Sequence, residues 1–255
     1  MIRKAVFGQI AVTGGGINGS MNGTTKFVDG DFECEAVGKA VTITDYKGNA
    51  KDVAIPGAIG KLTVIVIGEG AFEDKRLSGV TIPDSVRVIG DGAFAENRLT
   101  GVTIPGGVKT IGNYAFANNK LTGITVPGSI TAIGDWAFSV NDLTDITIPG
   151  SITTIGDWAF SDNRLTSVTI GNAVVSIGEY AFANNELTSV TIPGSVASIG
   201  KYAFADNKLT SVTIGANVET ADNAFPENLR DVYTNGGKQA GTYVSSDGRT
   251  WSKQQ

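Results

Sequence analysis

Residues 187–208, LTSVTIPGSVASIGKYAFADNK, decide the fold of this chain, because close copies of this stretch fill most of the sequence. A period of roughly 20 to 50 residues is the signature of a solenoid, in which identical units stack on one another. The repetition therefore predicts one continuous elongated domain and not two globular ones. The first leucine of each copy recurs every 22 residues, as Leu77, Leu99, Leu121, Leu143, Leu165, Leu187 and Leu209.

Each unit has the pattern of two short strands and a compact turn. In the run LTSVTI, Val190 and Ile192 alternate with polar residues, as a half-buried strand requires. Pro193 and Gly194 end this strand, because proline cannot donate to a sheet ladder and glycine tolerates the turn. A second extended piece follows, and the turn after it returns Phe204 to the interior. Stacking of the units predicts parallel-stranded sheets.

A row of asparagines stands two residues before the leucines. A polar residue repeated at a tight turn usually bonds to backbone groups that the bend leaves unpaired, so we expect a structural ladder and not a binding site. The row comprises Asn97, Asn119, Asn141, Asn163, Asn185 and Asn207.

The pattern LTxVTIPxSVxxIGxxAFxxN resembles the BspA-type leucine-rich repeats of bacterial surface proteins. Family repeats commonly carry cysteine where this chain has asparagine after AFxx, followed by a spacer one residue longer. The resemblance implies a β-rich leucine-rich repeat solenoid with short 3-10 or helical turns. It also implies a secreted or cell-surface protein that adheres to host extracellular-matrix proteins or to other cells, without identifying the ligand.

The repeats divide the chain into four expected parts. Residues 1–26 form a flexible or irregular lead-in, residues 27–52 an N-terminal β cap, and residues 53–232 the repeats. Residues 233–255 form a C-terminal hairpin cap, because two extended pieces flank Asp247 and Gly248 and end with Trp251. Such caps keep the terminal rungs from presenting open sheet edges and apolar rows to water.

Composition argues against several classes of function. The net charge of −5, without a long basic run, disfavours nucleic acid as a partner. No stretch approaches the apolar length of a membrane span, and the first residues make a poor signal peptide because Gly8 and Gln9 interrupt their apolar run. Histidine is absent, and Cys34, the single cysteine, has no imidazole to activate it. We therefore expect no catalytic residues, no metal and no cofactor.

One row of acidic residues leaves an alternative open. Asp135, Asp157 and Glu179 lie one period apart, and carboxylates on adjacent rungs can act as a glycosidase pair or hold calcium. A row of carboxylates on a repeat surface is more often simply solvated, so catalysis and calcium binding are remote alternatives.

An aromatic row next to these carboxylates is the best candidate site. The row occupies the position two residues before each repeat phenylalanine. Glycine and asparagine stand at the same position in other repeats, as Gly92 and Asn223, so we expect this position to face outward. The rings either cover backbone on the surface or form a contact stripe, since exposed Tyr and Trp anchor protein interfaces. The predicted binding residues are Tyr114, Trp136, Trp158, Tyr180 and Tyr202, supported by Asp135 and Asp157.

The sequence thus predicts a non-catalytic protein–protein interaction or adhesion module. Its expected partner is an extracellular-matrix or cell-surface protein. Two alternatives remain. The aromatic row with its aspartates also suits sugar rings, and the repeats can serve as a structural or assembly scaffold.

Overall fold

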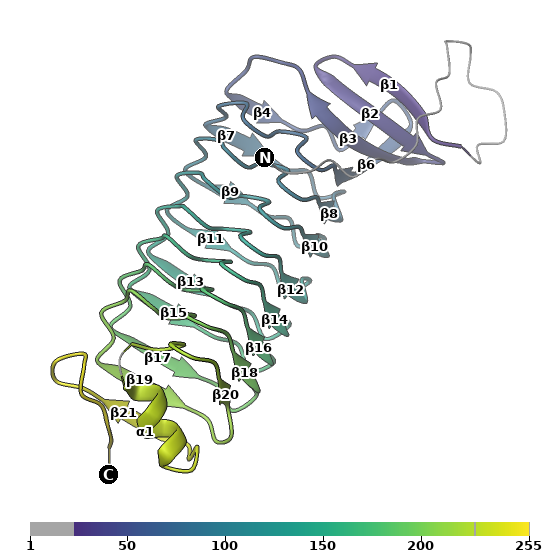
Figure 1. Cartoon of the computed structure of the whole chain (residues 1–255). Coiled ribbons are helices and arrows are strands. Elements are labelled where there is room, and N and C mark those ends of the chain that lie inside the picture. Colours follow the sequence, from purple (N-terminus) through teal and green to yellow (C-terminus); the bar gives the residue numbers. More distant parts are fainter. Residues whose placement is uncertain (1–22, 227, 255) are drawn as a thin grey trace.

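The computed structural model describes residues 23–226 and 228–254. The chain coils into an elongated solenoid with short strands on two sides and tight turns between them (Figure 1). Each 22-residue unit makes one rung, and this confirms the predicted leucine-rich repeat solenoid with capped ends. The predicted lead-in of residues 1–26 lies mostly outside the described residues.

The first row of strands comes from the LTxVTI segments. Its members lie side by side along the solenoid, and partners are one period apart, as in the parallel pair of Ser167 with Asp145. The strands are β4 (Asp52–Ala54), β7 (Gly79–Thr81), β9 (Val102–Thr103), β11 (Ile124–Thr125), β13 (Asp145–Thr147), β15 (Ser167–Thr169), β17 (Ser189–Ile192) and β19 (Ser211–Ile214).

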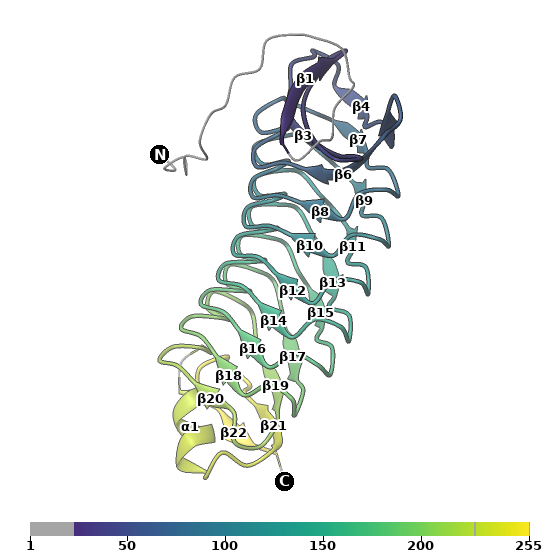
Figure 2. The ribbon, with the colours of Figure 1, turned by 90° about the vertical axis from the view of Figure 1, so that its right-hand side faces the viewer.

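The second row of strands runs beside the first, and each of its strands before β20 ends at the repeat isoleucine (Figure 2). It is also parallel with a period of 22, so that Ile155 pairs with Ile177, except at its last pair, where Ile199 and Thr220 are 21 residues apart. The strands are β6 (Leu62–Ile67), β8 (Val88–Ile89), β10 (Thr110–Ile111), β12 (Ala132–Ile133), β14 (Thr154–Ile155), β16 (Ser176–Ile177), β18 (Ser198–Ile199) and β20 (Glu219–Thr220).

Both ends of the solenoid are covered. At the N-terminal end β1 (Thr25–Asp29), β2 (Phe32–Val37) and β3 (Ala40–Tyr46) form an antiparallel sheet, and β3 continues parallel to β6. The expanded first repeat adds β5 (Ala58–Ile59), antiparallel to β6. At the other end β21 (Gly241–Val244) pairs antiparallel with β19 and with β22 (Ser252–Lys253), and Trp251 is buried.

A short helix in the C-terminal cap was not predicted. Helix α1 (Leu229–Asn235) follows the last rung and buries Leu229 and Tyr233. The Tyr233 hydroxyl donates to the carbonyl of Gly215 at 2.7 Å and accepts from the Val218 N–H at 2.9 Å. The helix thereby closes the apolar interior where the strands stop.

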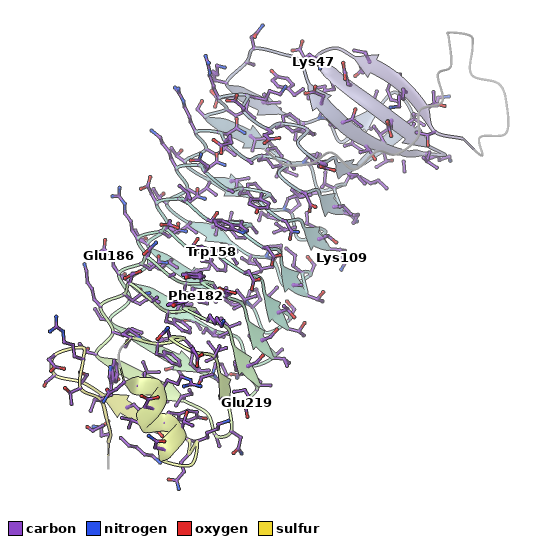
Figure 3. The ribbon with its side chains drawn as sticks, in the orientation of Figure 1. Lys47, Lys109, Trp158, Phe182, Glu186 and Glu219 are labelled. Carbon is purple, nitrogen blue, oxygen red and sulfur yellow. The ribbon has the colours of Figure 1, made fainter. Side chains whose placement is uncertain are left out.

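The interior consists of rows of identical side chains. Buried phenylalanines stack from rung to rung with centroids 5.1 to 5.6 Å apart. Figure 3 shows Phe182 inside the coil, Glu186 at the edge formed by the turns, and Lys109 and Glu219 at the opposite edge. The phenylalanines are Phe72, Phe94, Phe116, Phe138, Phe160, Phe182, Phe204 and Phe225.

The asparagine row is the predicted structural ladder. Asn163 is buried, and its Oδ1 accepts from the Leu143 N–H of the preceding rung at 3.1 Å. Its amide donates to three carbonyls, those of Phe138, Phe160 and Ser161, at 3.0 to 3.2 Å. The oxygen and both N–H groups of the side chain are therefore engaged, so the row ties adjacent rungs together.

Candidate functional site

The five aromatic side chains of the predicted site form one stacked row, called here the aromatic row. Successive ring centroids are 5.7, 4.6, 3.9 and 4.8 Å apart from Tyr114 to Tyr202, and the rings are within 7 to 19° of parallel. These separations fall within or just below the range of about 4.5–7 Å that aromatic pairs prefer. Aromatic residues 22 apart in the sequence therefore form a continuous stack of rings.

The backbone under this row has the left-handed conformation. The φ angles of the five aromatic residues lie between 53 and 60°, and those of Gly70 and Gly92, at the same place in earlier rungs, are 60°. Asn223 ends the series with φ of 56°. Glycine and asparagine adopt this conformation readily, whereas a bulky side chain there costs about 1–2 kcal/mol. The turn fixes it, because the N–H of Trp158 donates to the Glu179 carbonyl of the next rung.

Exposure in the aromatic row is limited to ring edges along most of its length. Tyr114 is 37% exposed, and the other four residues are half-buried. Each inner ring has a neighbour on both faces, so the faces that a sugar would need are covered. Burial, with smaller effects from Tyr202 and nearby carboxylates, raises the pKa of the Tyr180 hydroxyl, which stays neutral near pH 7.

The predicted supporting aspartates bond to the protein backbone. Asp135 Oδ1 accepts from the Asp157 N–H at 2.9 Å, and Asp157 Oδ1 accepts from the Glu179 N–H at 2.7 Å. Asn113 makes the same contact with the Asp135 N–H at 2.8 Å. One oxygen of each aspartate thus joins adjacent rungs, and the second oxygen is the one left for a ligand beside the aromatic row.

Two observations on the described residues bear on metal binding and on nucleophilic catalysis. Among residues 23–226 and 228–254, no group of three or more Cys, Asp or Glu side chains could hold a metal ion. Burial, with a smaller effect from Asp29, raises the pKa of the Cys34 thiol to about 11. The thiolate that a nucleophile requires is therefore scarce at neutral pH.

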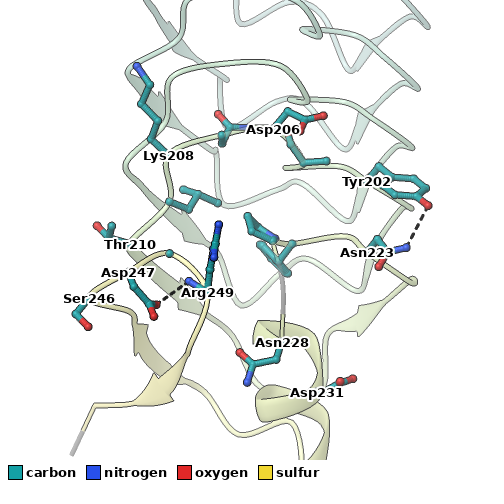
Figure 4. Close-up of a pocket in the computed structure, with 16 residues that line it drawn as sticks. Tyr202, Asp206, Lys208, Thr210, Asn223, Asn228, Asp231, Ser246, Asp247 and Arg249 are labelled. Atoms are coloured by element: carbon teal, nitrogen blue, oxygen red, sulfur yellow. Dashed lines mark hydrogen bonds between the residues drawn. The ribbon is translucent and has the colours of Figure 1, made fainter.

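A hollow of about 1000 Å³ lies where the aromatic row meets the C-terminal cap (Figure 4). The last full turn, the segment before α1 and the hairpin loop line it. Asn223 donates to the Tyr202 hydroxyl at 3.1 Å, and Asp247 accepts from the Arg249 N–H at 2.8 Å. Its charged lining contains Asp206, Lys208, Asp231, Asp247 and Arg249, so it offers both signs of charge to water.

A second, shallower hollow of about 530 Å³ lies on the first strand row, over β9 and β11. Gly101 and Gly123 leave space there, since nothing lies within 4 Å of the position that a Cβ would take at either. Val102 and Ile124 consequently remain half-exposed. The sequence analysis predicted neither hollow. The hollow over β9 and β11 could have been predicted from the two glycines, Gly101 and Gly123, in the first strand row.

Comparison with protein families gives a direct match. A family described as the BspA type leucine rich repeat region matches in six copies, over residues 65–185 and 154–239. These ranges cover more than half of the sequence. The chain belongs to the BspA-type leucine-rich repeat family. None of the curated proteins compared with it is similar in sequence.

Solved structures of bacterial leucine-rich repeat proteins resemble this BspA-type chain. A leucine rich cell surface protein from Faecalibacterium prausnitzii has a TM-score of 0.62 and 25% identity over 91% of this chain. The match spans 61% of that longer protein. A leucine-rich repeat protein from Bacteroides ovatus has a TM-score of 0.51 and 21% identity. The match covers 76% of this chain and 66% of that protein. The T. pallidum leucine rich repeat protein has a TM-score of 0.51 and 22% identity. The match covers 81% of this chain and 94% of that protein.

The Bacteroides ovatus and T. pallidum structures, with the lower sequence identities, support the fold alone.

Within residues 23–226 and 228–254, no helix of the BspA-type chain has the length and apolar character needed to cross a membrane.

Proposed function

We propose that this BspA-type chain is a non-catalytic interaction module that binds a protein on a host or cell surface. The aromatic row is its contact site, with the free oxygens of Asp135 and Asp157 in support. Its location would be secreted or cell-surface. The similarity to the Faecalibacterium prausnitzii cell surface protein supports that location.

The observation that carries the proposal is five consecutive aromatic residues in left-handed backbone conformations. Glycine or asparagine would avoid the backbone strain, and the chain uses both at this position in other rungs. Residues held in a disfavoured conformation cluster at functional sites. Tyr and Trp also dominate the binding energy of protein interfaces, and a row of five rungs at about 4.8 Å per strand offers roughly 20 Å of contact.

Stacking favours a protein partner over a sugar. A sugar ring packs against an open aromatic face, and the inner faces of the row are occupied by neighbouring rings. The exposed edges, with the tyrosine hydroxyls and aspartate oxygens near them, suit the mixed apolar and polar surface of a protein. The absence of histidine and the high pKa of Cys34 support the non-catalytic assignment.

Binding to immobilised matrix proteins, with a glycan array in parallel, tests the proposal. The test variant is Trp136→Asn with Trp158→Asn, because asparagine at Asn223 already adopts this backbone conformation. The matched control is Thr147→Ala with Thr169→Ala, two exposed residues of the first strand row. We expect a saturable protein partner whose affinity falls at least tenfold in the tryptophan variant only.

An unchanged affinity in the tryptophan variant would show that the aromatic row is not the site. A saturable glycan lost in that variant would favour the carbohydrate alternative. Light scattering that rises with protein concentration, in the absence of any binding, would favour the scaffold alternative.

A further inference from the structure

The aromatic row has a one-rung gap at its N-terminal end. At Gly92, one rung before Tyr114, nothing lies within 4 Å of the position that a Cβ would occupy. One rung further, at Gly70, the corresponding position is 3.1 Å from Oε2 of Glu73. The gap is therefore bounded by the Tyr114 ring on one side and by the Glu73 carboxylate on the other.

The size of the gap matches one planar group. The buried rings of the same three rungs, Phe72, Phe94 and Phe116, are 5.1 and 5.3 Å apart. A group centred in the Gly92 rung would thus lie about 5 Å from the Tyr114 ring, within the distance of roughly 6 Å for a cation over an aromatic face. Tyr114 stacks on Trp136 with one face only, and its other face points toward the gap.

The charge around the gap selects a cation. Glu69, Glu73 and Asp91 are exposed, and none of them forms a salt bridge with a residue in the described part of the chain. Lys75, two residues after Glu73, is paired with Asp45 at 2.8 Å. Asp91 Oδ1 accepts from the Asn113 N–H at 2.8 Å, in the contact that Asp135 and Asp157 repeat in later rungs. The carboxylates of Glu69 and Glu73 and the second oxygen of Asp91 therefore lie beside an open aromatic face without a cationic partner among the described residues.

We propose that the Gly92 gap binds an arginine side chain of the protein partner. A guanidinium is planar, stacks on aromatic faces and presents paired donors that match a carboxylate. It would lie against the Tyr114 ring, tilted so that an N–H at its edge donates to Glu73. A lysine ammonium has the charge without the planar shape, and a neutral ring leaves the carboxylate without a donor. This inference rests on the proposed function, since it names the chemistry recognised at one end of the same row.

The probe for this test is N-acetyl-L-arginine amide, followed through the ring signals of carbon-13-labelled tyrosine in NMR. N-acetyl-L-lysine amide tests charge alone, and N-acetyl-L-citrulline amide tests planar shape without charge. We expect the arginine probe to shift the Tyr114 signals and to bind about fivefold more tightly than the citrulline probe, the ratio that a cation–π contact of about 1 kcal/mol gives. It should also bind more tightly than the lysine probe, which lacks the planar shape.

Gly92→Tyr is the blocking variant, because it completes the row with the protein's own ring in a backbone conformation that tyrosine already adopts at Tyr114. It should abolish binding of the arginine probe, and Glu73→Gln, an exposed substitution, should weaken it at least threefold. Gly123→Ser is the control, at an open glycine of the first strand row, and should change nothing. Equal binding of citrulline, or retained arginine binding in Gly92→Tyr, would overturn the proposal.

The two proposals fail separately. If the partner binds Gly92→Tyr normally but loses affinity in the Trp136 and Trp158 variant, the aromatic row is a site and the arginine assignment is wrong. If arginine binding is lost in Gly92→Tyr while the tryptophan variant keeps full affinity for the partner, the gap is a cation site and the proposed contact stripe is wrong.

Discussion

Val140 has the left-handed backbone conformation, which a β-branched side chain disfavours. Its φ is 52°, and its side chain is 45% exposed at the turn edge of the solenoid. The same place in other rungs holds Asp, Glu or Asn. There Asn118 donates to Glu96 at 2.6 Å, and Asn184 donates to Asp162 at 2.9 Å. A valine side chain cannot make such a hydrogen bond, so the left-handed conformation is strained at this position.

We expect Val140→Asn to raise the free energy of unfolding by about 1 kcal/mol, because asparagine tolerates this conformation and its amide can bond to a neighbouring rung. Urea denaturation measures the change. Val175→Asn is the control, since Val175 is 48% exposed immediately before β16 and does not have a positive φ. Equal effects of the two substitutions would mean that strain at Val140 contributes nothing.

Residue roles differ in how far the sequence reveals them. The role of Asn163 could be predicted, because a repeated amide at a turn has few functions other than bonding to backbone. The conformation of Trp158 could not, since its φ is fixed by hydrogen bonds between rungs that no single unit contains. The backbone contact of Asp135 was hidden for the same reason, and the sequence alone presented it as a free carboxylate.

At the scale of the rung, close approach depends on the glycine that follows the second strand. A Cβ at Gly156 would lie 2.6 Å from Oδ1 and 2.7 Å from the backbone nitrogen of Asp135. Gly156→Ala must push two rungs apart, and we expect a loss of about 1–3 kcal/mol in the free energy of unfolding.

Gly150→Ala is the matched control for this substitution. Nothing lies within 4 Å of a Cβ there, so we expect little change or a small gain from a less flexible unfolded chain. Chemical denaturation of both variants separates them. A tolerated Gly156→Ala would show that the rungs can shift without cost and that the asparagine ladder alone sets their spacing.

The hairpin of the C-terminal cap depends on Asp247. Its carboxylate accepts from the Thr250 and Arg249 N–H groups at 2.8 Å and from the Ser245 hydroxyl at 2.9 Å. These bonds, the backbone ones first, lower the pKa of Asp247 to about 2. The unfolded value is about 3.9, so the stabilisation is complete above that pH and is lost as the pH falls through about 2.

Protection factors for hydrogen exchange at the Arg249 and Thr250 amides should therefore fall between about pH 4 and pH 2. Asp247→Asn keeps an acceptor without a titrating group, so its protection should stay constant over this range. Wild-type protection that is independent of pH would show that backbone pairing of β21 with β22 holds the loop without the carboxylate.

The elements predicted least well lie in the caps. The strands and turns of every regular rung could be predicted from the period of 22, because each apolar residue packs against the equivalent residue of the next rung. Helix α1 has no copy elsewhere in the sequence to reveal it. The helix forms because the last rung leaves an apolar end that Leu229 and Tyr233 cover.

The whole molecule behaves as a one-dimensional stack closed at both ends. Strand β3 covers the first rungs through β6, and β21 pairs with β19 at the other end. Between the caps each rung packs on its two neighbours, and the phenylalanine row passes through all of them. Stability in such a stack is approximately a sum of rung terms and nearest-neighbour interface terms.

Removal of one whole period should therefore leave a folded protein. Deletion of residues 144–165 joins Leu143 to Thr166, which restores the LTSVTI segment and brings Phe138 against Phe182. We expect cooperative unfolding at a modestly lower temperature. The molecule should be shorter by about one strand spacing, near 4.8 Å, in X-ray scattering. The aromatic row would lose Trp158 and close into four contiguous rings.

Deletion of half a period, residues 144–154, is the control for chain length. It joins Leu143 to Ile155 and places second-strand residues against first-strand residues, so no rung beyond the junction can keep its register with those before it. We expect this variant to lose cooperative unfolding and to aggregate through the exposed strand edges. If both deletions fold equally well, the rungs are independent of register. If both fail, the stack requires its full length between the caps, and a sum of neighbour terms does not describe it.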